Sequence, residues 1–373
     1  MTLRHSLAKY IAIAASILAL VTSGAYAGDG EAANDIAHFI AGMPPSANSP
    51  LSSLTSDAEW KHHSTFFDAS WKEYEERQLS KVRAWSAENV KQSQPVLYYM
   101  FSGPDFLYAD AFFPNAKTII MSGLEPSGPI PELNEFSAHG LGRELGAVRG
   151  ALGNLLKHGY FITSEMGSQL SRSRLYGTMP VIYLFLARSG KTIHDVSLVA
   201  LDKEGKVHPQ GEAGLESSAK GVKIVYSGSD GQERTLYYFR TDLSNKGVAT
   251  SGFLQFCHGF GPGDSFVKSA SYLLHNPGFS DVRDFLLKNS VAIVQDDTGI
   301  PIRYLSASDW QLRPYGIYLH PIRQFWHADQ PKLSELYRKE HPAPLNFAVG
   351  YHWGKPSNLL IAQKAGAAAT EVK

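Results

Sequence analysis

The sequence predicts an α/β fold: a mixed, mainly parallel sheet covered by helices, with an antiparallel β extension in the middle of the chain. Continuous apolar runs of strand length, VLYYMF at 96–101 and TIIM at 118–121, flank the helical segment LYADAFF at 107–113. Such runs are typical of strands that a covered parallel sheet buries on both faces. Between residues 191 and 241 the segments are β-rich, and SDG at 229–231 favours an antiparallel hairpin.

Residues 1–27 have the pattern of a secretory signal peptide. Arg4 and Lys9 precede an apolar run at 11–21, and AYA at 25–27 fits the site at which a signal peptidase cleaves. The run is shorter than the ~20 residues that span a bilayer as a helix, and no cysteine follows directly that could carry a lipid. We therefore expect a periplasmic or secreted protein with no stable membrane anchor after the leader is removed.

Beyond the leader, the sequence predicts one large domain. Residues 28–56 are expected to form a linker or arm, because GMPPSANSPLSSLTS at 42–56 is rich in proline, serine and other small residues. A single α/β domain is predicted over 57–362, followed by a flexible tail at 363–373. Asp57 can cap a long helix in which large apolar residues recur every three to four positions.

The remaining elements follow from the same apolar patterns. Two similar α/β halves are predicted at 95–190 and 249–355, with the β-rich insert 191–241 between them. We expect helices at 132–157, 266–274, 281–288 and 333–339. We expect strands at 180–187, 193–201, 222–226, 235–240, 250–257, 291–294, 317–319 and 347–351.

A repeated order of elements favours an internal duplication. The segment GPDF around Asp105 and the segment PGDSF around Asp264 each lead toward a helix and a second apolar strand, which Glu125 and Asp297 follow. These acids would then lie at the carboxyl ends of strands, where open α/β sheets bind ligands. Helix capping is the alternative role for the first two acids. Turn formation is the alternative for Glu125, Asp297 and the neighbouring Asp296.

The leading functional hypothesis is an exported enzyme of hydrolase type that acts on a carbohydrate-like or other polar envelope substrate. One of Glu125 and Asp297 would be the general acid or base, and the other would orient the substrate or stabilise positive charge. Asp296 is a third catalytic candidate. The predicted substrate-binding residues are Asp105, Asp264, Arg303, His139, Arg143 and Trp310.

Two alternatives stay open. A non-catalytic envelope protein that binds a ligand or a partner would explain the lack of a catalytic signature equally well. Ser265 and Lys268 match the S-x-x-K pattern of serine enzymes that act on peptidoglycan, in which a lysine one helical turn later activates the serine. The same pattern occurs at 6–9 and 217–220, so it is not specific.

Charge and motif content disfavour other classes. Lys+Arg and Asp+Glu both number 35, and removing Arg4 and Lys9 leaves 33 against 35, a formal charge of −2. This balance does not favour nucleic-acid binding. The sequence has no complete dinucleotide-binding glycine fingerprint and no zinc-protease motif, so we expect neither a cofactor nor a metal. The single Cys257 cannot form an internal disulfide and is expected to be buried.

Overall fold

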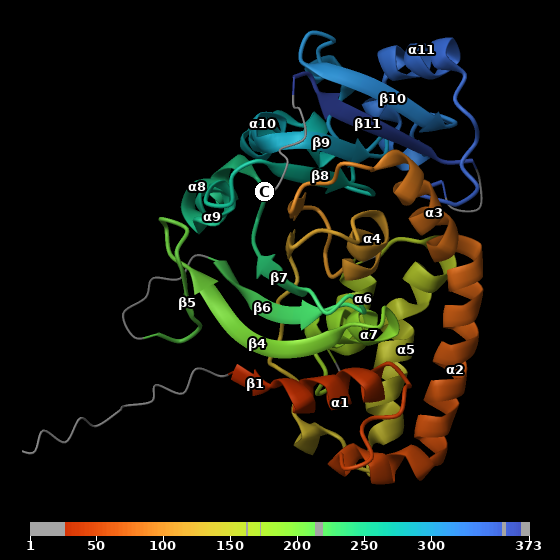
Figure 1. The fold of residues 1–373 in the computed structure, drawn as a ribbon, viewed down its shortest axis with the longest axis vertical. Coiled ribbons are helices and arrows are strands. Elements are labelled where there is room, and N and C mark those ends of the chain that lie inside the picture. The colour runs from red at the N-terminus through yellow and green to blue at the C-terminus, as the bar shows by residue number, and fades with distance from the viewer. Residues whose placement is uncertain (1–26, 162, 172, 213–218, 353–355, 367–373) are drawn as a thin grey trace, which may run out of the picture.

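The computed structural model describes residues 27–366 apart from 162, 172, 213–218 and 353–355. All but the last residue of the expected signal peptide lies outside the described residues, as does most of the expected tail. One twisted sheet forms the centre of the fold, and helices pack on both of its faces (Figure 1). The predicted α/β class is therefore confirmed.

The sheet has a parallel centre and antiparallel flanks. Its strands are β1 (Ala27–Asp29), β2 (Val96–Tyr99), β3 (Thr118–Gly123), β4 (Thr192–Leu201), β5 (Val207–Pro209), β6 (Ala219–Ser227), β7 (Glu233–Arg240), β8 (Gly263–Val267), β9 (Ser290–Gln295), β10 (Trp310–Gly316) and β11 (Asn358–Lys364). Their order is β1-β4-β6-β7-β3-β2-β8-β9-β11-β10, and β5 pairs with β4. The run from β7 to β9 is parallel, and the strands outside it pair antiparallel. The sheet is thus mixed, as predicted, but it is not mainly parallel: of the pairings among the described strands, four are parallel and six are antiparallel. The mid-chain extension β4–β7 is antiparallel as expected.

The helices form two layers around the sheet. They are α1 (Gly30–Ile40), α2 (Ala58–Tyr74), α3 (Ser80–Asn89), α4 (Phe106–Phe112), α5 (Leu141–His158), α6 (Thr163–Leu170), α7 (Met179–Arg188), α8 (Asn245–Ser251), α9 (Phe253–His258), α10 (Ser280–Asn289) and α11 (Pro331–Glu340). Helices α1 to α7 contribute to one hydrophobic core, and α8 to α11 contribute to a second. Within the described chain, none of the helices combines the length and the apolar character that crossing a membrane requires.

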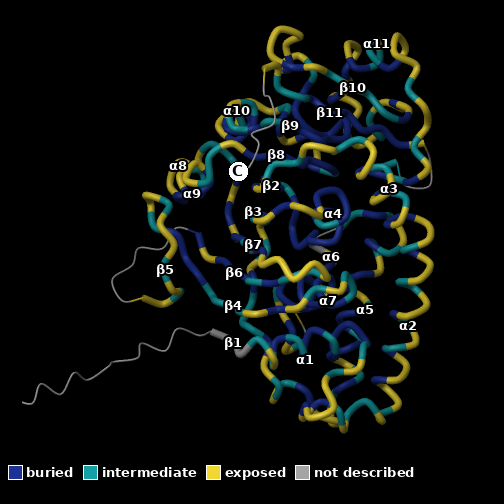
Figure 2. The backbone as a smooth tube through the Cα atoms, viewed as in Figure 1, coloured by how far each residue is buried: buried dark blue, intermediate teal, exposed yellow. Residues whose placement is uncertain are grey.

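Alternation along the central strands separates the two cores. In β2, Leu97 and Tyr99 belong to the first core, whereas Val96 and Tyr98 belong to the second. All four side chains are buried, because successive residues of a strand point to opposite faces and helices cover both faces here. Figure 2 shows this burial along the central strands, with exposed positions gathered on the outer side of α2.

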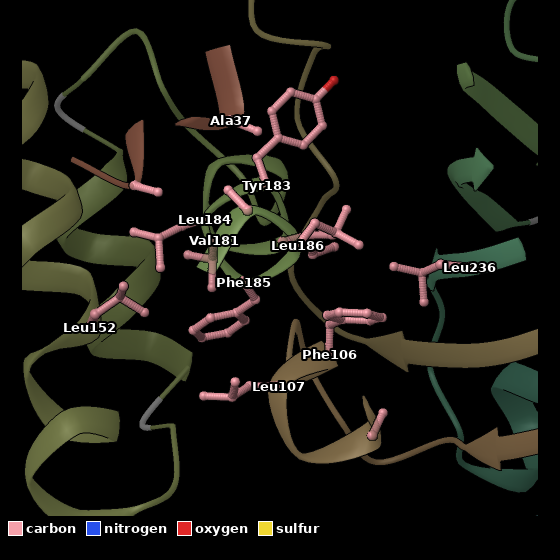
Figure 3. Close-up of a cluster of buried hydrophobic side chains, with 14 of the residues drawn as sticks. Ala37, Phe106, Leu107, Leu152, Val181, Tyr183, Leu184, Phe185, Leu186 and Leu236 are labelled. Carbon is pink, nitrogen blue, oxygen red and sulfur yellow. The ribbon is translucent and has the colours of Figure 1, made fainter. Parts of the chain in front are cut away.

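Helix α7 corrects one of our predictions. We expected a strand at 180–187, but every residue from Met179 to Ala187 is buried within a helix in the middle of the first core. Figure 3 shows side chains such as Phe185 and Leu186 from this helix among residues of α4 and α5. A run that is apolar on all sides has no period to distinguish a helix from a strand. Pro180 in the first turn suits a helix start, since its missing N–H would have no partner there.

Five further segments differ from prediction. The helix expected at 132–157 begins only at Leu141, as α5. Residues 250–257 lie in α8 and α9 rather than in a strand, and the helix expected at 266–274 is replaced by the end of β8, a loop and the start of a 3-10 helix, Leu273–His275. The last two strands are β10 and β11 rather than 317–319 and 347–351. The structure does contain two parallel crossovers, β2-α4-β3 and β8-α10-β9. The segments GPDF and PGDSF are not equivalent in them, because the first follows β2 and the second begins β8.

The folded body begins earlier than we expected. The chain at 28–56, predicted as a linker or arm, contains α1, whose Ile36, Phe39 and Ile40 are buried in the first core. The long helix after Asp57 is confirmed as α2, and the Asp57 carboxylate accepts the N–H of Glu59 at 2.8 Å. A π-helical turn, Glu75–Leu79, joins α2 to α3.

Candidate ligand-binding cleft

A cleft of about 290 Å³ opens where the central parallel strands end. The loops after β2, β3, β7 and β8 supply its lining, so four neighbouring strands deliver residues to one place. Tyr160 and Phe161 after α5, and Tyr351 ahead of β11, complete the wall. This is the edge at which open α/β sheets bind ligands.

A buried ion pair forms the floor of the cleft. The Nζ atom of Lys268 lies 2.9 Å from Oδ2 of Asp105, and the two side chains are only 3% and 2% exposed. Oδ2 of Asp105 also accepts the Tyr99 hydroxyl at 2.8 Å, and Oδ1 accepts the N–H of Tyr108 at 3.2 Å. Asp105 therefore does cap α4, which was the alternative role for this residue.

Lys268 has further partners besides the carboxylate. Its ammonium donates to the Gly159 carbonyl at 3.3 Å and lies 4.2 Å from the centre of the Tyr108 ring. Burial, and after it the nearby Asp105 carboxylate, raises the pKa of Tyr99 well above its ordinary value, so this phenol stays a hydrogen-bond donor. The charges of Lys268 and Asp105 thus cancel, and both side chains have hydrogen-bond partners within the protein.

Glu125 lies at the end of β3 with its carboxylate uncompensated. Its backbone carbonyl accepts the Tyr238 hydroxyl at 2.8 Å, which fixes the turn. A Cβ built on Gly123 would lie 3.1 Å from Oε2 of Glu125 and 3.1 Å from the Cα of Gly103. Among the described residues, none donates a hydrogen bond to this carboxylate or forms an ion pair with it. Arg240 donates instead to the Leu124 carbonyl at 3.0 Å.

Two buried hydroxyls in the cleft wall have no partner within the described chain. They are Oγ1 of Thr241, a residue 5% exposed, and Oγ of Ser269. The backbone N–H of Thr241 donates to the Gly123 carbonyl at 3.0 Å, which places this threonine beside the turn that carries Glu125. Buried hydroxyls in proteins are normally hydrogen-bonded. Both oxygens are shielded from solvent, so a ligand in the cleft reaches them only if these side chains change rotamer.

The loop after β8 is conformationally strained. Ser269, Ser271 and Tyr272 have φ values of 51°, 49° and 55°, in the left-handed region that side chains with a Cβ disfavour. The N–H of Ser269 donates to Oδ2 of Asp296 at 2.8 Å, and the Tyr351 hydroxyl donates to the Ser269 carbonyl at 2.6 Å. Strain of this kind persists where surrounding bonds enforce it, and such sites cluster in ligand-binding regions.

Asp296 and Asp297, both predicted as catalytic, support this loop from behind. Asp296 accepts from Ser269 and Thr298, and burial, then its neighbour Asp297, raises its pKa. Asp297 accepts the Tyr272 hydroxyl at 2.5 Å and the side-chain amide of Asn358 at 3.0 Å. Neither acid lines the cleft. The predicted pairing of Glu125 with Asp297 across one cleft is therefore not found.

The other predicted contacts are scattered over the molecule. Asp264 lies within β8 near the opposite edge of the sheet, where both of its oxygens accept backbone N–H groups. Arg303 donates to a carbonyl on the surface, Trp310 is buried in the second core, and His139 and Arg143 lie near the start of α5. None of these five side chains lines the cleft.

Serine chemistry finds no support in this geometry. Ser265 is buried in β8 and pairs with the Ser290 hydroxyl at 2.6 Å. Lys268 follows the end of β8, and its ammonium bonds to Asp105 and to the Gly159 carbonyl rather than to Ser265. Ser269 has no base within hydrogen-bond reach among the described residues. The N–H of Ala270 already donates to the Thr298 hydroxyl at 2.8 Å, so it does not stabilise an oxyanion.

Sequence reasoning missed several residues of the cleft. Thr241 could have been found, because it directly follows the strand predicted at 235–240 and strand ends were the criterion for the other candidates. Ser269 could not have been found, because we predicted a helix at 266–274 and therefore no strand end at Val267. The aromatic residues Tyr160 and Tyr351 come from distant parts of the chain, and their meeting leaves no local signal.

Comparison of the chain with protein-family models, with curated proteins and with solved structures finds no match. Across the described ranges, no group of three or more His, Cys, Asp or Glu side chains is arranged to hold a metal ion. The chemistry of the cleft lining is therefore the basis for a functional proposal.

Proposed function

We propose that the protein binds a small polyhydroxylated, carbohydrate-like ligand in the cleft at the carboxyl ends of β2, β3, β7 and β8. The observation that carries the proposal is the unpartnered Glu125 carboxylate in the cleft lining, together with the Thr241 and Ser269 side chains, whose hydroxyls would turn toward a ligand by a change of rotamer. A ligand hydroxyl can donate and accept at once, so it can satisfy hydroxyl and carboxylate groups together. A purely apolar ligand would leave all three unsatisfied.

The size and the rings of the cleft support the same class of ligand. A volume of about 290 Å³ is at the lower end for small-molecule sites, which suits one or two sugar rings. The rings of Tyr160 and Tyr351 meet edge to face with centres 5.2 Å apart at the wall. Aromatic faces of this kind can cover the apolar C–H face of a sugar.

Binding without hydrolysis is the version that the geometry favours. Acid–base hydrolysis of a glycosidic bond needs two carboxyl groups on opposite sides of that bond. Of the other acids in the lining, Asp105 is held by Lys268, and Asp242 accepts both the N–H and the hydroxyl of Ser244. Glu125 is then the one carboxylate of the described lining that is free to act, which supports our non-catalytic alternative over the hydrolase hypothesis.

We further propose that the protein acts after export, in the periplasm or outside the cell. The support is the signal-peptide pattern at 1–27. The mass of the protein recovered from its native host tests this directly. A chain that begins at Gly28 is expected, whereas an intact N-terminus on the accumulated protein would contradict export through this leader.

The binding proposal is tested by calorimetric titration of the purified protein with glucose, galactose, mannose and their 2-amino and 2-acetamido derivatives. We expect at least one of these sugars to bind. Thr241→Val should weaken that binding by about tenfold, and Glu125→Gln by about tenfold or more, as expected for lost neutral and charged hydrogen bonds. The matched controls Thr65→Val and Glu88→Gln change exposed residues outside the cleft and should leave affinity unchanged. No binding by any sugar, or equal losses in the controls, would refute the proposal.

A further inference from the structure

We propose that the ligand of the cleft carries a positive charge, and that Glu125 selects an amino sugar or amino polyol over its neutral counterpart. This inference rests on the proposed function and narrows its ligand class. Among the described residues, the lining includes the carboxylates of Asp105, Glu125 and Asp242, and one cation, Lys268.

The described part of the lining is therefore left with excess negative charge. Lys268 and Asp105 cancel each other in the floor at 2.9 Å. Asp242 is bonded to the neutral donors of Ser244 at 2.8 and 2.9 Å, so its hydrogen-bonding capacity is used but its charge is not cancelled. Glu125 has neither a donor nor a cation among the described residues. A half-buried charge without a partner is costly, and a cationic group of a ligand would compensate it.

The cations of the described residues do not compensate Glu125. Arg240 at the end of β7 directs its Nε to the Leu124 carbonyl at 3.0 Å and makes no ion pair with Glu125. Lys268 is occupied by Asp105 and the Gly159 carbonyl. The described residues also offer no set of three metal-ligating side chains, and we take the complementary group to be an ammonium.

An independent observation lies beside the carboxylate. Oγ1 of Thr241 is buried and unpartnered, and the backbone N–H of Thr241 is anchored on the carbonyl of Gly123 at 3.0 Å. Oε2 of Glu125 lies 3.1 Å from the place where a Gly123 side chain would begin. The backbone of Thr241 and the carboxylate of Glu125 thus lie next to the same glycine.

An ammonium group suits this arrangement because it is a donor only. It has three N–H groups and no acceptor, so it can bond to a carboxylate and a hydroxyl oxygen together. The rings of Tyr160, Phe161 and Tyr351 in the same lining add aromatic faces, which attract cations. A neutral hydroxyl at this position would bond to Glu125 without compensating its charge.

The experiment compares matched sugars that differ at one position. Glucosamine, glucose and N-acetylglucosamine, with the corresponding galactose and mannose sets, are titrated by calorimetry at about pH 6, where the free amine is protonated. We expect the amine of at least one set to bind about tenfold tighter than its hydroxyl and acetamido forms. Glu125→Gln should reduce this preference to within about threefold, while the control Glu88→Gln should retain it.

A second measurement needs no variant and covers the case in which Glu125→Gln does not fold. Raising NaCl from about 50 to about 500 mM should weaken binding of the amine to wild-type protein, because salt screens charge attraction, and should leave the neutral sugar unaffected. Neutral and amino sugars that bind equally, or a preference that survives Glu125→Gln, would overturn the inference while the proposed function stands. If none of the sugars binds, the proposed function itself fails and the inference fails with it.

Discussion

Replacing the unpartnered hydroxyl of Thr241 by a methyl group should stabilise the protein. Thr241 and Thr298 form a matched pair, since both are buried, at 5% and 0% exposure, and valine conserves the branched shape of each. Oγ1 of Thr241 has no partner in the described structure, whereas Oγ1 of Thr298 accepts the N–H of Ala270 and donates to Asp296. The two variants therefore make the same change, a hydroxyl to a methyl group, at one residue without a hydrogen bond and at one residue with two.

The expected magnitudes follow from those bonds. An unsatisfied buried hydroxyl costs about 1–3 kcal/mol of desolvation. We expect Thr241→Val to raise the free energy of unfolding by the lower end of this range, about 1 kcal/mol. Thr298→Val removes two bonds, one of them to a buried carboxylate, and should lower the free energy of unfolding by about 2–4 kcal/mol.

Urea unfolding at neutral pH, followed by circular dichroism, measures both changes, and an unchanged slope with denaturant shows that only stability has changed. We expect the two variants to shift the midpoint in opposite directions. If Thr241→Val destabilised the protein as much as Thr298→Val, the Thr241 hydroxyl would already have a partner, contrary to our expectation. Weaker sugar binding by a more stable Thr241→Val variant would link that hydroxyl to the ligand rather than to the fold.

The same unfolding assay tests three other features of the structure. Lys268→Met leaves Asp105 buried without its cation and should cost about 3–5 kcal/mol; a loss under about 1 kcal/mol would show that water compensates the carboxylate. A Cβ on Gly123 would lie 2.7 Å from a tyrosine hydroxyl, so Gly123→Ala should destabilise the protein by about 1–3 kcal/mol. A Cβ on Gly153 in α5 would have no neighbouring atom within 4 Å, so the control Gly153→Ala should stabilise the protein by about 0.5–1 kcal/mol. Burial raises the pKa of Asp264 to about 7, so the stability linked to its proton is complete below about pH 4 and is lost as the pH rises through about 7. Wild type should therefore lose roughly 2–4 kcal/mol relative to Asp264→Asn between these limits, and parallel pH profiles would contradict this.

Part of the candidate site was predictable because strand ends are local features. The apolar runs at 96–101 and 118–121 end just before Asp105 and Glu125, and both residues line the cleft. The role of Asp105 was not predictable, since its partner Lys268 is 163 positions away, and only the β2–β8 pairing brings the two loops together. Asp297 also follows a predicted strand, yet the hydroxyl of Tyr272 and the amide of Asn358 hold it outside the cleft.

The sequence by itself determined the α/β class, the antiparallel hairpin of β6 and β7, and the helix that Asp57 caps, because turn residues, caps and amphipathic periods act over a few neighbouring positions. Only the tertiary structure decided that 180–187 is helical, since a segment buried on every side is equally apolar as a helix or a strand. It also decided which charges are compensated. The sequence shows that a residue is acidic but not whether a cation lies beside its carboxylate, because that cation can come from a loop far away in the chain.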